Sequence, residues 1–139
     1  MQLTYEDLRI CHSLAVEARE IMDRVDAMEA FAARSTPQYG ATAAGPVTHD
    51  RVGDGAAQIV DYMAGRREVA CAYFEHAAIV EAAIDGIKDS TQRRVMRLRY
   101  VDGMRWEQIQ LITKYAEAQV YRIHAEALDE MKIAKDDSK

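Results

Sequence analysis

The chain has 139 residues, of which 49% are hydrophobic, with two cysteines, two prolines and a formal net charge of −5. This length predicts one domain, or one small domain with an appendage, and the composition favours helices and excludes a disulfide framework. The charged N-terminus does not have the pattern of a signal peptide, and the sequence contains no run of about 18 apolar residues that could cross a membrane. We therefore expect a soluble cytoplasmic protein without membrane contact.

The charge is unevenly distributed along the chain. Residues 1–87 carry 7 basic against 14 acidic side chains, whereas residues 88–139 carry 11 basic against 9 acidic ones. The basic surplus begins with a cluster of six cations: Lys88, Arg93, Arg94, Arg97, Arg99 and Arg105. A local basic patch on an acidic protein fits nucleic-acid contact, and a solvated helix face explains it equally well.

A long amphipathic helix is predicted from about residue 4 to residue 34. Thr4 and Asp7 form a start that is similar to a capping box. Apolar residues then recur at every third or fourth position: Leu8, Cys11, Leu14, Ala18, Ile21, Val25, Met28 and Ala32. A stripe this narrow is typical of a coiled-coil seam.

Residues 35–50 contain both prolines together with glycines and hydroxyl residues, which predicts a loop. We assign no specific role to Tyr39 or His49 in this loop.

A second long helix is predicted from about residue 50 to residue 87, with an interruption near Gly65. Its stripe consists of Val52, Ala56, Ile59, Met63, Arg67, Ala70, Phe74, Ala77, Val80, Ile84 and Ile87.

Two long helices joined by a loop predict an antiparallel helical hairpin over residues 1–87. A hairpin alone buries little surface, and a second copy of the chain would supply the missing partner, so we expect a homodimer through these helices. Cys11 and Cys71 lie on or beside the two stripes. They are predicted to be small buried hydrophobic residues rather than a redox pair.

Residues 88–139 predict a second domain of three short helices. Asp89 and Ser90 offer N-caps for the first helix, which should end at Asp102-Gly103. The other two should run over residues 105–113 and 116–133, with a turn at 114–115 between them. This order suits a helix-turn-helix, in which one helix braces a second one that lies in the major groove of DNA.

The apolar spacing separates a buried face from a free face in this domain. The brace should bury Trp106, Ile109 and Ile112, and the last helix should bury Val120, Ile123, Ala127, Leu128 and Met131. The opposite face of the last helix offers Glu117, Ala118, Tyr121, Arg122 and Ala125. An arginine there can donate two hydrogen bonds to guanine, and a tyrosine can reach a phosphate or stack on a base edge.

Signatures of catalysis and of metal binding are absent from the sequence. The four histidines share no ligand spacing, so a packed His124 is the expectation. No phosphate-binding glycine loop, nucleophile elbow or zinc-protease motif is present. We therefore expect no enzyme activity, no cofactor and no metal.

Two segments carry a resemblance to a known family, namely RLRYVDGMRWEQI and YAEAQVYRIHAEAL. This part of the chain, about 45 residues, resembles region 4 of bacterial sigma factors. More narrowly, it is similar to the RinA/ArpU group of phage-encoded, sigma-like transcription regulators. The resemblance implies binding to double-stranded promoter DNA, control of phage genes and contact with host RNA polymerase.

Position by position, the resemblance implies DNA contacts from Glu117, Ala118, Tyr121 and Arg122, and Gln119 is predicted to bind DNA with them. It implies phosphate contacts near Arg97, Arg99, Arg105 and the turn that begins at Lys114. Four positions depart from the family pattern, and Ala118 offers no hydrogen bond to a base. Gln110 stands in place of an alanine at the helix crossing, and Arg105 stands in place of a capping serine or threonine. Ala116 stands where an N-capping serine or threonine is usual, and Lys114 stands where a turn glycine is common.

Two other functions stay open at this point. A small DNA-packaging subunit of a phage also joins a helix-turn-helix to helical oligomerisation segments, and a ring of about eight or more copies would favour it. A module that docks on RNA polymerase without touching DNA is the third reading. Binding to phosphates should weaken steeply as salt rises, whereas apolar docking should not.

Overall fold

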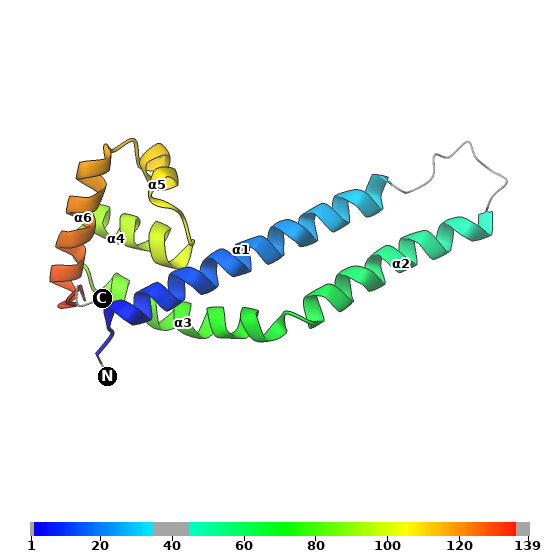
Figure 1. The fold of residues 1–139 in the computed structure, drawn as a ribbon, viewed down its shortest axis with the longest axis horizontal. Helices are drawn as coiled ribbons and strands as arrows, with labels where there is room; N and C mark the ends of the chain where they lie inside the picture. The colour runs from blue at the N-terminus through cyan, green and yellow to red at the C-terminus, as the bar shows by residue number, and fades with distance from the viewer. Residues whose placement is uncertain (1, 35–44, 136–139) are drawn as a thin grey trace. The chain divides into compact units, whose positions relative to one another are not determined.

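The computed structural model describes residues 2–34 and 45–135, and between residues 45 and 54 it describes the backbone alone. Every regular element in these ranges is helical, as predicted. In chain order they are α1 (Tyr5–Arg34), α2 (Gly45–Ala64), α3 (Arg67–Asp85), α4 (Ser90–Met96), the π-helical turn η2 (Arg97–Val101), α5 (Trp106–Thr113) and α6 (Glu117–Glu130) (Figure 1).

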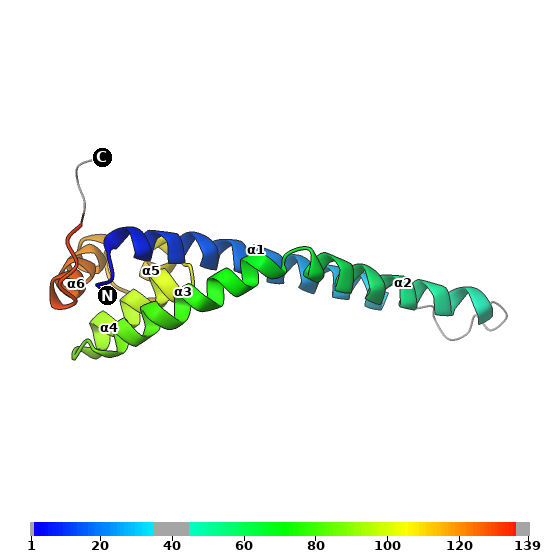
Figure 2. The same ribbon diagram turned by 90° about the horizontal axis from the view of Figure 1, so that it is seen from below.

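The chain divides into two compact units. One consists of Met1–Ala18 with Val69–Lys139, and the other of Arg19–Glu68. The boundary expected after Ile87 therefore lies inside the first unit. The reason is that the first turns of α1 and most of α3 pack with η2 and α6 around one core, which includes Leu8, Cys11, Val80, Ile84, Met96, Tyr100, Ala127 and Leu128. Figure 2 shows α4, α5 and α6 gathered at the N-terminal end of α1.

Helix α1 begins as its sequence predicts. The Thr4 amide donates to Asp7 Oδ2 at 2.9 Å, and the Asp7 amide donates to Thr4 Oγ1 at 3.2 Å. These two bonds satisfy amides that have no partner inside the helix. Ala15 is also buried, although it lies outside the predicted stripe, because the loop at Gly103 packs against it.

The predicted helix over residues 50–87 is in fact two helices, α2 and α3. The break follows from Gly65 and Arg66, whose amides donate to Asp61 O at 3.1 Å and to Met63 O at 3.0 Å. The second bond spans three residues instead of four, which closes the last turn of α2. Glycine is a poor helix former, so the break occurs where the sequence is weakest.

Helix α2 also begins at Gly45, earlier than the predicted start near residue 50, so the loop prediction is wrong for residues 45–50. Pro46 lies in the first turn, where the missing amide hydrogen is not needed. Residues 35–44 with Tyr39, and the side chain of His49, lie outside what the structure describes. Within the second unit, Ala32 of α1 lies close to Gly55 of α2, where an added Cβ would be 3.2 Å from Ala32 Cβ.

The predicted stripe on α3 is correct only in its second half. Ala77, Val80, Ile84 and Ile87 are buried, whereas Phe74 is 67% exposed. Tyr73 turns inward in its place and packs against the core.

The two cysteines differ in burial, since Cys11 is buried and Cys71 is exposed. The prediction that both are buried is therefore confirmed for Cys11 and wrong for Cys71. No helix in the described ranges is long and apolar enough to span a bilayer.

Candidate nucleic-acid interface

Helix α4 and η2 form the base on which the two last helices rest. Asp89 caps α4, because its Oδ1 accepts from the Thr91 amide at 2.7 Å and from the Gln92 amide at 3.3 Å. The helix then widens, and the Asp102 amide donates to Arg97 O, five residues back, at 3.0 Å. Such a π-turn shifts the register of the hydrogen bonds and leaves carbonyl groups in need of other donors.

Side chains of α1 and α3 satisfy these carbonyl groups. The pairs are Cys11 Sγ with Tyr100 O at 3.2 Å, His12 Nδ1 with Arg99 O at 2.7 Å, and Tyr73 Oη with Val101 O at 2.7 Å. Burial, and secondly the charge of Glu81, raise the pKa of Cys11 to about 11, so the thiol keeps its proton and donates. The end of η2 is thereby tied to two helices, which fixes where α5 begins.

Helix α5 packs on α4 and α6 through a small apolar cluster of Val95, Ile109, Val120 and Ile123. Two of the three predicted brace residues point inward, with Ile109 fully buried and Trp106 half-buried. The third prediction is wrong, because Ile112 is 42% exposed. Thr113 is buried instead, one turn after Ile109, and its hydroxyl donates to Ile109 O at 2.7 Å.

The turn between α5 and α6 contains Lys114 and Ala116, two of the positions that depart from the pattern of the regulators that the sequence resembles. Lys114 adopts a left-handed conformation with φ 66° and ψ 21°, which favours glycine. Its amide still donates to Gln110 O at 2.8 Å, and this bond closes α5. Ala116 then takes the N-cap position of α6 with an extended backbone and no side-chain hydrogen bond.

We therefore expect Ala116→Ser to stabilise the protein by about 1 kcal/mol, because a hydroxyl at this position can accept from an unpaired amide of the first turn of α6. Urea unfolding followed by circular dichroism measures the change. The matched control is Ala118→Ser, which places the same hydroxyl two residues later, inside the helix. That variant should be neutral or slightly destabilised, and equal stabilisation by both would contradict the assignment of the cap.

Helix α6 buries the predicted stripe and ends earlier than predicted. Val120, Ile123, Ala127 and Leu128 are buried, and Met131 is half-buried. The helix stops at Glu130 rather than near residue 133. Lys132 has φ 61°, its amide donates to Asp129 O at 3.0 Å, and the Ile133 amide donates to Leu128 O at 2.9 Å. This pair of bonds is a Schellman motif, and it returns Ile133 to the core.

His124 is packed inside the protein, as predicted. Tyr100 Oη lies 2.7 Å from His124 Nε2, and the Trp106 ring meets the imidazole edge to face with centroids 4.9 Å apart. Burial is the main reason that the pKa of His124 falls to about 4, and burial also raises the pKa of Tyr100. Both groups are neutral at pH 7, so the phenol donates to Nε2. No group of three or more metal-binding side chains occurs among the described residues.

The face of α6 opposite this packing is open to solvent. Glu117, Ala118, Tyr121 and Arg122 are exposed, and Gln119 is half-buried. Residues one turn apart lie on the same face, so these side chains form one strip along the first two turns of α6. The Tyr121 ring packs edge to face on Trp106 with centroids 5.1 Å apart, which orients it while leaving it 42% exposed.

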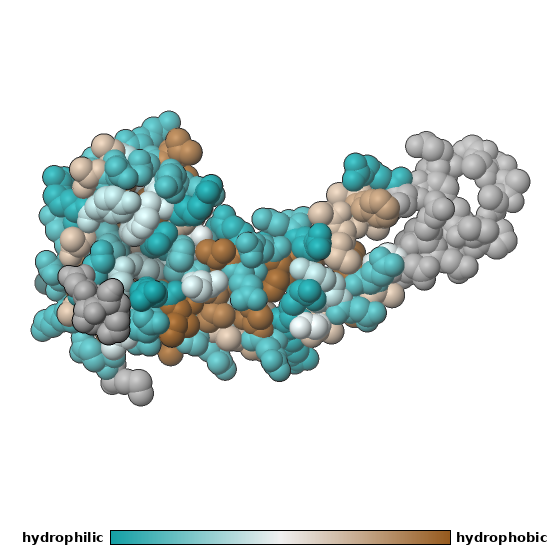
Figure 3. Space-filling view, viewed as in Figure 1, coloured by the Kyte–Doolittle hydropathy of each residue, from teal (hydrophilic) through white to brown (hydrophobic). Residues whose placement is uncertain are grey.

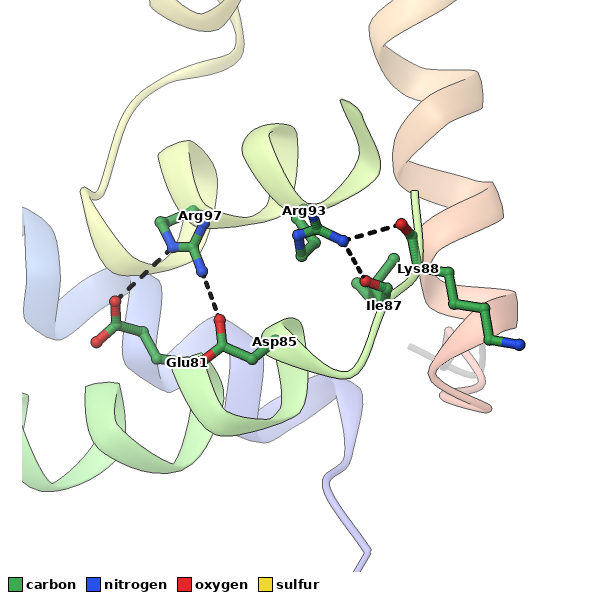
Figure 4. Close-up of polar contacts among 6 residues, drawn as sticks. All are labelled: Glu81, Asp85, Ile87, Lys88, Arg93 and Arg97. Atoms are coloured by element: carbon green, nitrogen blue, oxygen red, sulfur yellow. Dashed lines mark hydrogen bonds and ion pairs between the residues drawn. The ribbon is translucent and has the colours of Figure 1, made fainter. Parts of the chain in front are cut away.

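The arginines that precede the turn between α5 and α6 have different surroundings in the structure. Arg97 Nη2 lies 2.6 Å from Asp85 Oδ1, and Arg97 Nε lies 3.8 Å from Glu81 Oε2. Arg93 donates to the carbonyl groups of Ile87 and Lys88 at 2.6 and 2.9 Å and so holds the segment between α3 and α4 (Figure 4). These guanidinium groups are engaged by the protein itself.

Arg99 is also held inside the fold. Its guanidinium lies over the Trp106 ring at 4.3 Å from the centroid, and its Nη1 donates to Met104 O at 3.0 Å. Burial lowers the pKa of Arg99. Arg105 and Lys114, by contrast, are exposed on either side of α5, as is Arg94 on α4. The structure therefore separates the cations that the sequence groups together.

The contacts that hold this candidate interface in place are not predicted by the sequence. Nothing in the spacing of the residues identifies Cys11, His12 and Tyr73 as donors to η2, because they lie far from it in the chain.

A scan against models of protein families, a search of curated proteins and a search of solved structures each found no match.

Proposed function

We propose that this protein is a DNA-binding transcription regulator in which α5 braces α6 and α6 enters the major groove. The observation that carries the proposal is the exposed strip from Glu117 to Arg122 on a helix whose other face is buried. A recognition helix needs such a division, with one face anchored in the protein and one free to meet base edges. Arg122 would read guanine, and Tyr121, held by Trp106, would contact a base or a phosphate.

Phosphate contacts in this proposal come from Arg105 and Lys114. Both are exposed, and they lie at the start of α5 and at the turn before α6. Arg97 and Arg99 would contribute less, because their charges are engaged in part by the acidic residues of α3 and by Trp106. With two or three cations on the surface, we expect a modest dependence of affinity on salt.

The rest of the proposal follows the resemblance to phage-encoded, sigma-like regulators. The long helices would form an antiparallel hairpin that joins two copies of the chain, and α4, α5 and α6 would form the helix-turn-helix. The partners would be double-stranded promoter DNA and host RNA polymerase, in the cytoplasm of the bacterial host. No cofactor is required for such a function.

The experiment that tests DNA binding is a gel-shift titration with DNA from around this protein's own gene, at two salt concentrations and with competitor DNA. A shift that survives the competitor supports the regulator. A shift that is lost to competitor and salt means backbone contact alone, and would favour the packaging subunit if the protein also forms large rings.

A second candidate function is docking on a protein, such as RNA polymerase, without DNA contact. Leu111 favours it, because this large apolar side chain at the end of α5 is 77% exposed. The absence of any DNA shift, together with capture of polymerase that resists high salt, would support this function and overturn the first.

We expect Arg122→Ala to weaken binding to the preferred DNA by about 1–3 kcal/mol and to relax specificity at one base pair. Fluorescence anisotropy against a set of single-base variants of the site measures both effects. Arg24→Ala removes an exposed arginine from α1 and serves as the control, with no change expected. An unchanged affinity and an unchanged base preference in Arg122→Ala would show that this residue does not read a base.

A further inference from the structure

Helix α3 has an apolar face that the described residues of the chain leave exposed. Its inner face carries the core residues, whereas five residues on the other side are exposed and apolar. We call these the outer face of α3: Cys71, Phe74, Ala78, Ile79 and Ala82. Phe74 is 67% exposed and Ile79 is 61% exposed, and Figure 3 shows apolar residues gathered over α3. Contiguous exposed apolar surface of this kind marks an interaction site.

The outer face combines small and large residues in a way that fits a second α3. With 3.6 residues per turn, Cys71, Ala78 and Ala82 run along its centre, Phe74 lies at one flank and Ile79 at the other. We propose that a second copy of the chain docks here, so that two α3 helices pack antiparallel about a two-fold axis near residue 76. In this register Phe74 of one copy packs on the partner's Ala78, and Cys71 lies opposite the partner's Ala82.

The charges at the two ends of α3 favour the same arrangement. The helix begins with Arg67 and ends with Asp85. An antiparallel pair that overlaps over its whole length brings Arg67 to the partner's Asp85 at both ends. The Asp85 side chain already pairs with Arg97, but it is 65% exposed and can accept a second cation. A parallel pair would instead place like charges together, so the charges favour the antiparallel pair.

One residue opposes the pairing and makes the register testable. Glu75 is exposed within the outer face, between Ala82 and Ile79 around the helix. The axis near residue 76 places it close to the partner's Glu75. Two carboxylates at this distance repel each other. Removing this charge should therefore strengthen the dimer. An in-register parallel pair predicts the same effect, and the cross-link described below distinguishes the two arrangements.

The expected dimer is weak. A helix of 19 residues is about 28 Å long, and a contact one helix wide is smaller than the roughly 800 Å² per partner of a standard interface. We expect a monomer–dimer equilibrium at micromolar concentrations. This inference takes only the expectation of a dimer from the proposed function. Its experiments contain no DNA, so a failure to dimerise through α3 can be distinguished from a failure to bind DNA.

Sedimentation equilibrium of the full chain and its variants tests the surface. Phe74→Glu should weaken self-association by about 10- to 100-fold without loss of helicity, because the ring is exposed in the monomer. Glu75→Gln should strengthen it. Leu111→Glu is the matched control, a charge introduced at another exposed apolar residue, and it should change nothing. A wild-type chain that stays monomeric, or Phe74→Glu that associates like the wild type, would overturn the proposal.

A cross-link tests the orientation and the register. Ala82→Cys in the wild-type chain should give a covalent dimer on mild oxidation, and the additional change Cys71→Ser should abolish it. The two positions lie about 16 Å apart along one helix, so a disulfide between them must join two chains. Wild-type Cys71 should not cross-link, because the two copies of it lie about 15 Å apart in the antiparallel pair. A disulfide between the native Cys71 residues would show a parallel pair and would refute the arrangement.

Discussion

Gly103→Ala should destabilise the first compact unit by about 2–5 kcal/mol. Gly103 has φ 69°, where an L-residue costs about 1–2 kcal/mol. An added Cβ would also lie 2.9 Å from the Cβ and carbonyl carbon of Ala15 and from the Val16 amide nitrogen. Because two of these atoms belong to the backbone of α1, the clash cannot be relieved by turning a side chain, and overpacking of this kind costs about 1–3 kcal/mol more.

Urea unfolding followed by circular dichroism measures this loss. Gly65→Ala is the matched control, because a Cβ there would meet nothing closer than the carbonyl oxygens of Asp61 and Tyr62 at 3.7 Å, and its φ is not positive. That variant should be unchanged or slightly stabilised. Equal stability of Gly103→Ala and the wild type would show that the loop after η2 does not approach α1 as described.

The second large effect concerns pH. The pKa of His124 is about 4 in the folded protein and about 6.5 in an unfolded chain. As the pH falls below about 6.5, the unfolded state takes up the proton first, so stability is lost until the folded state also binds it near pH 4. This residue should therefore remove about 2–3 kcal/mol of stability between pH 7 and about pH 4.5. Burial lowers the pKa of His12 as well, which adds in the same direction.

The double variant Tyr100→Phe/His124→Phe isolates this contribution. Replacing both residues removes the bond between them without leaving either one unpaired. The loss of stability between pH 7 and about pH 4.5 should then be smaller by about 2–3 kcal/mol. His76→Gln removes a histidine whose Nδ1 bonds within α3, to Ala72 O, and serves as the control that keeps the dependence. A double variant as acid-sensitive as the wild type would show that His124 is not the group responsible.

The parts of the fold that the sequence predicts correctly depend on local interactions. Thr4 with Asp7, and Asp89 with the amides of α4, are caps that form between residues close in the chain. The buried stripe of α6 follows from apolar residues at spacings of three and four. The exposed strip from Glu117 to Arg122 follows from the same pattern, since a helix with one buried face must leave the other free.

The errors occur where distant contacts decide. Nothing local distinguishes Tyr73 from Phe74 as the inward residue, and Tyr73 is chosen because its hydroxyl reaches Val101 O. Distant residues also surround Arg97 and Arg99, because Asp85, Glu81 and Trp106 lie close enough in the fold to engage them, and their contact with phosphate stays a prediction. Which of several cations stays free for a ligand depends on which carboxylates and rings fold against them.

Local sequence is enough to predict that the chain is helical, where most of its helices begin, and which face of α6 is apolar, because caps and periodic patterns are properties of neighbouring residues. Contacts between distant segments are needed for α1 and α3 to complete the core of the C-terminal helices and for Cys11, His12 and Tyr73 to stabilise η2. The same kind of contact sets which arginines remain exposed. These features depend on hydrogen bonds, ion pairs and close backbone contacts between segments separated by up to about 90 residues, and no local pattern encodes them.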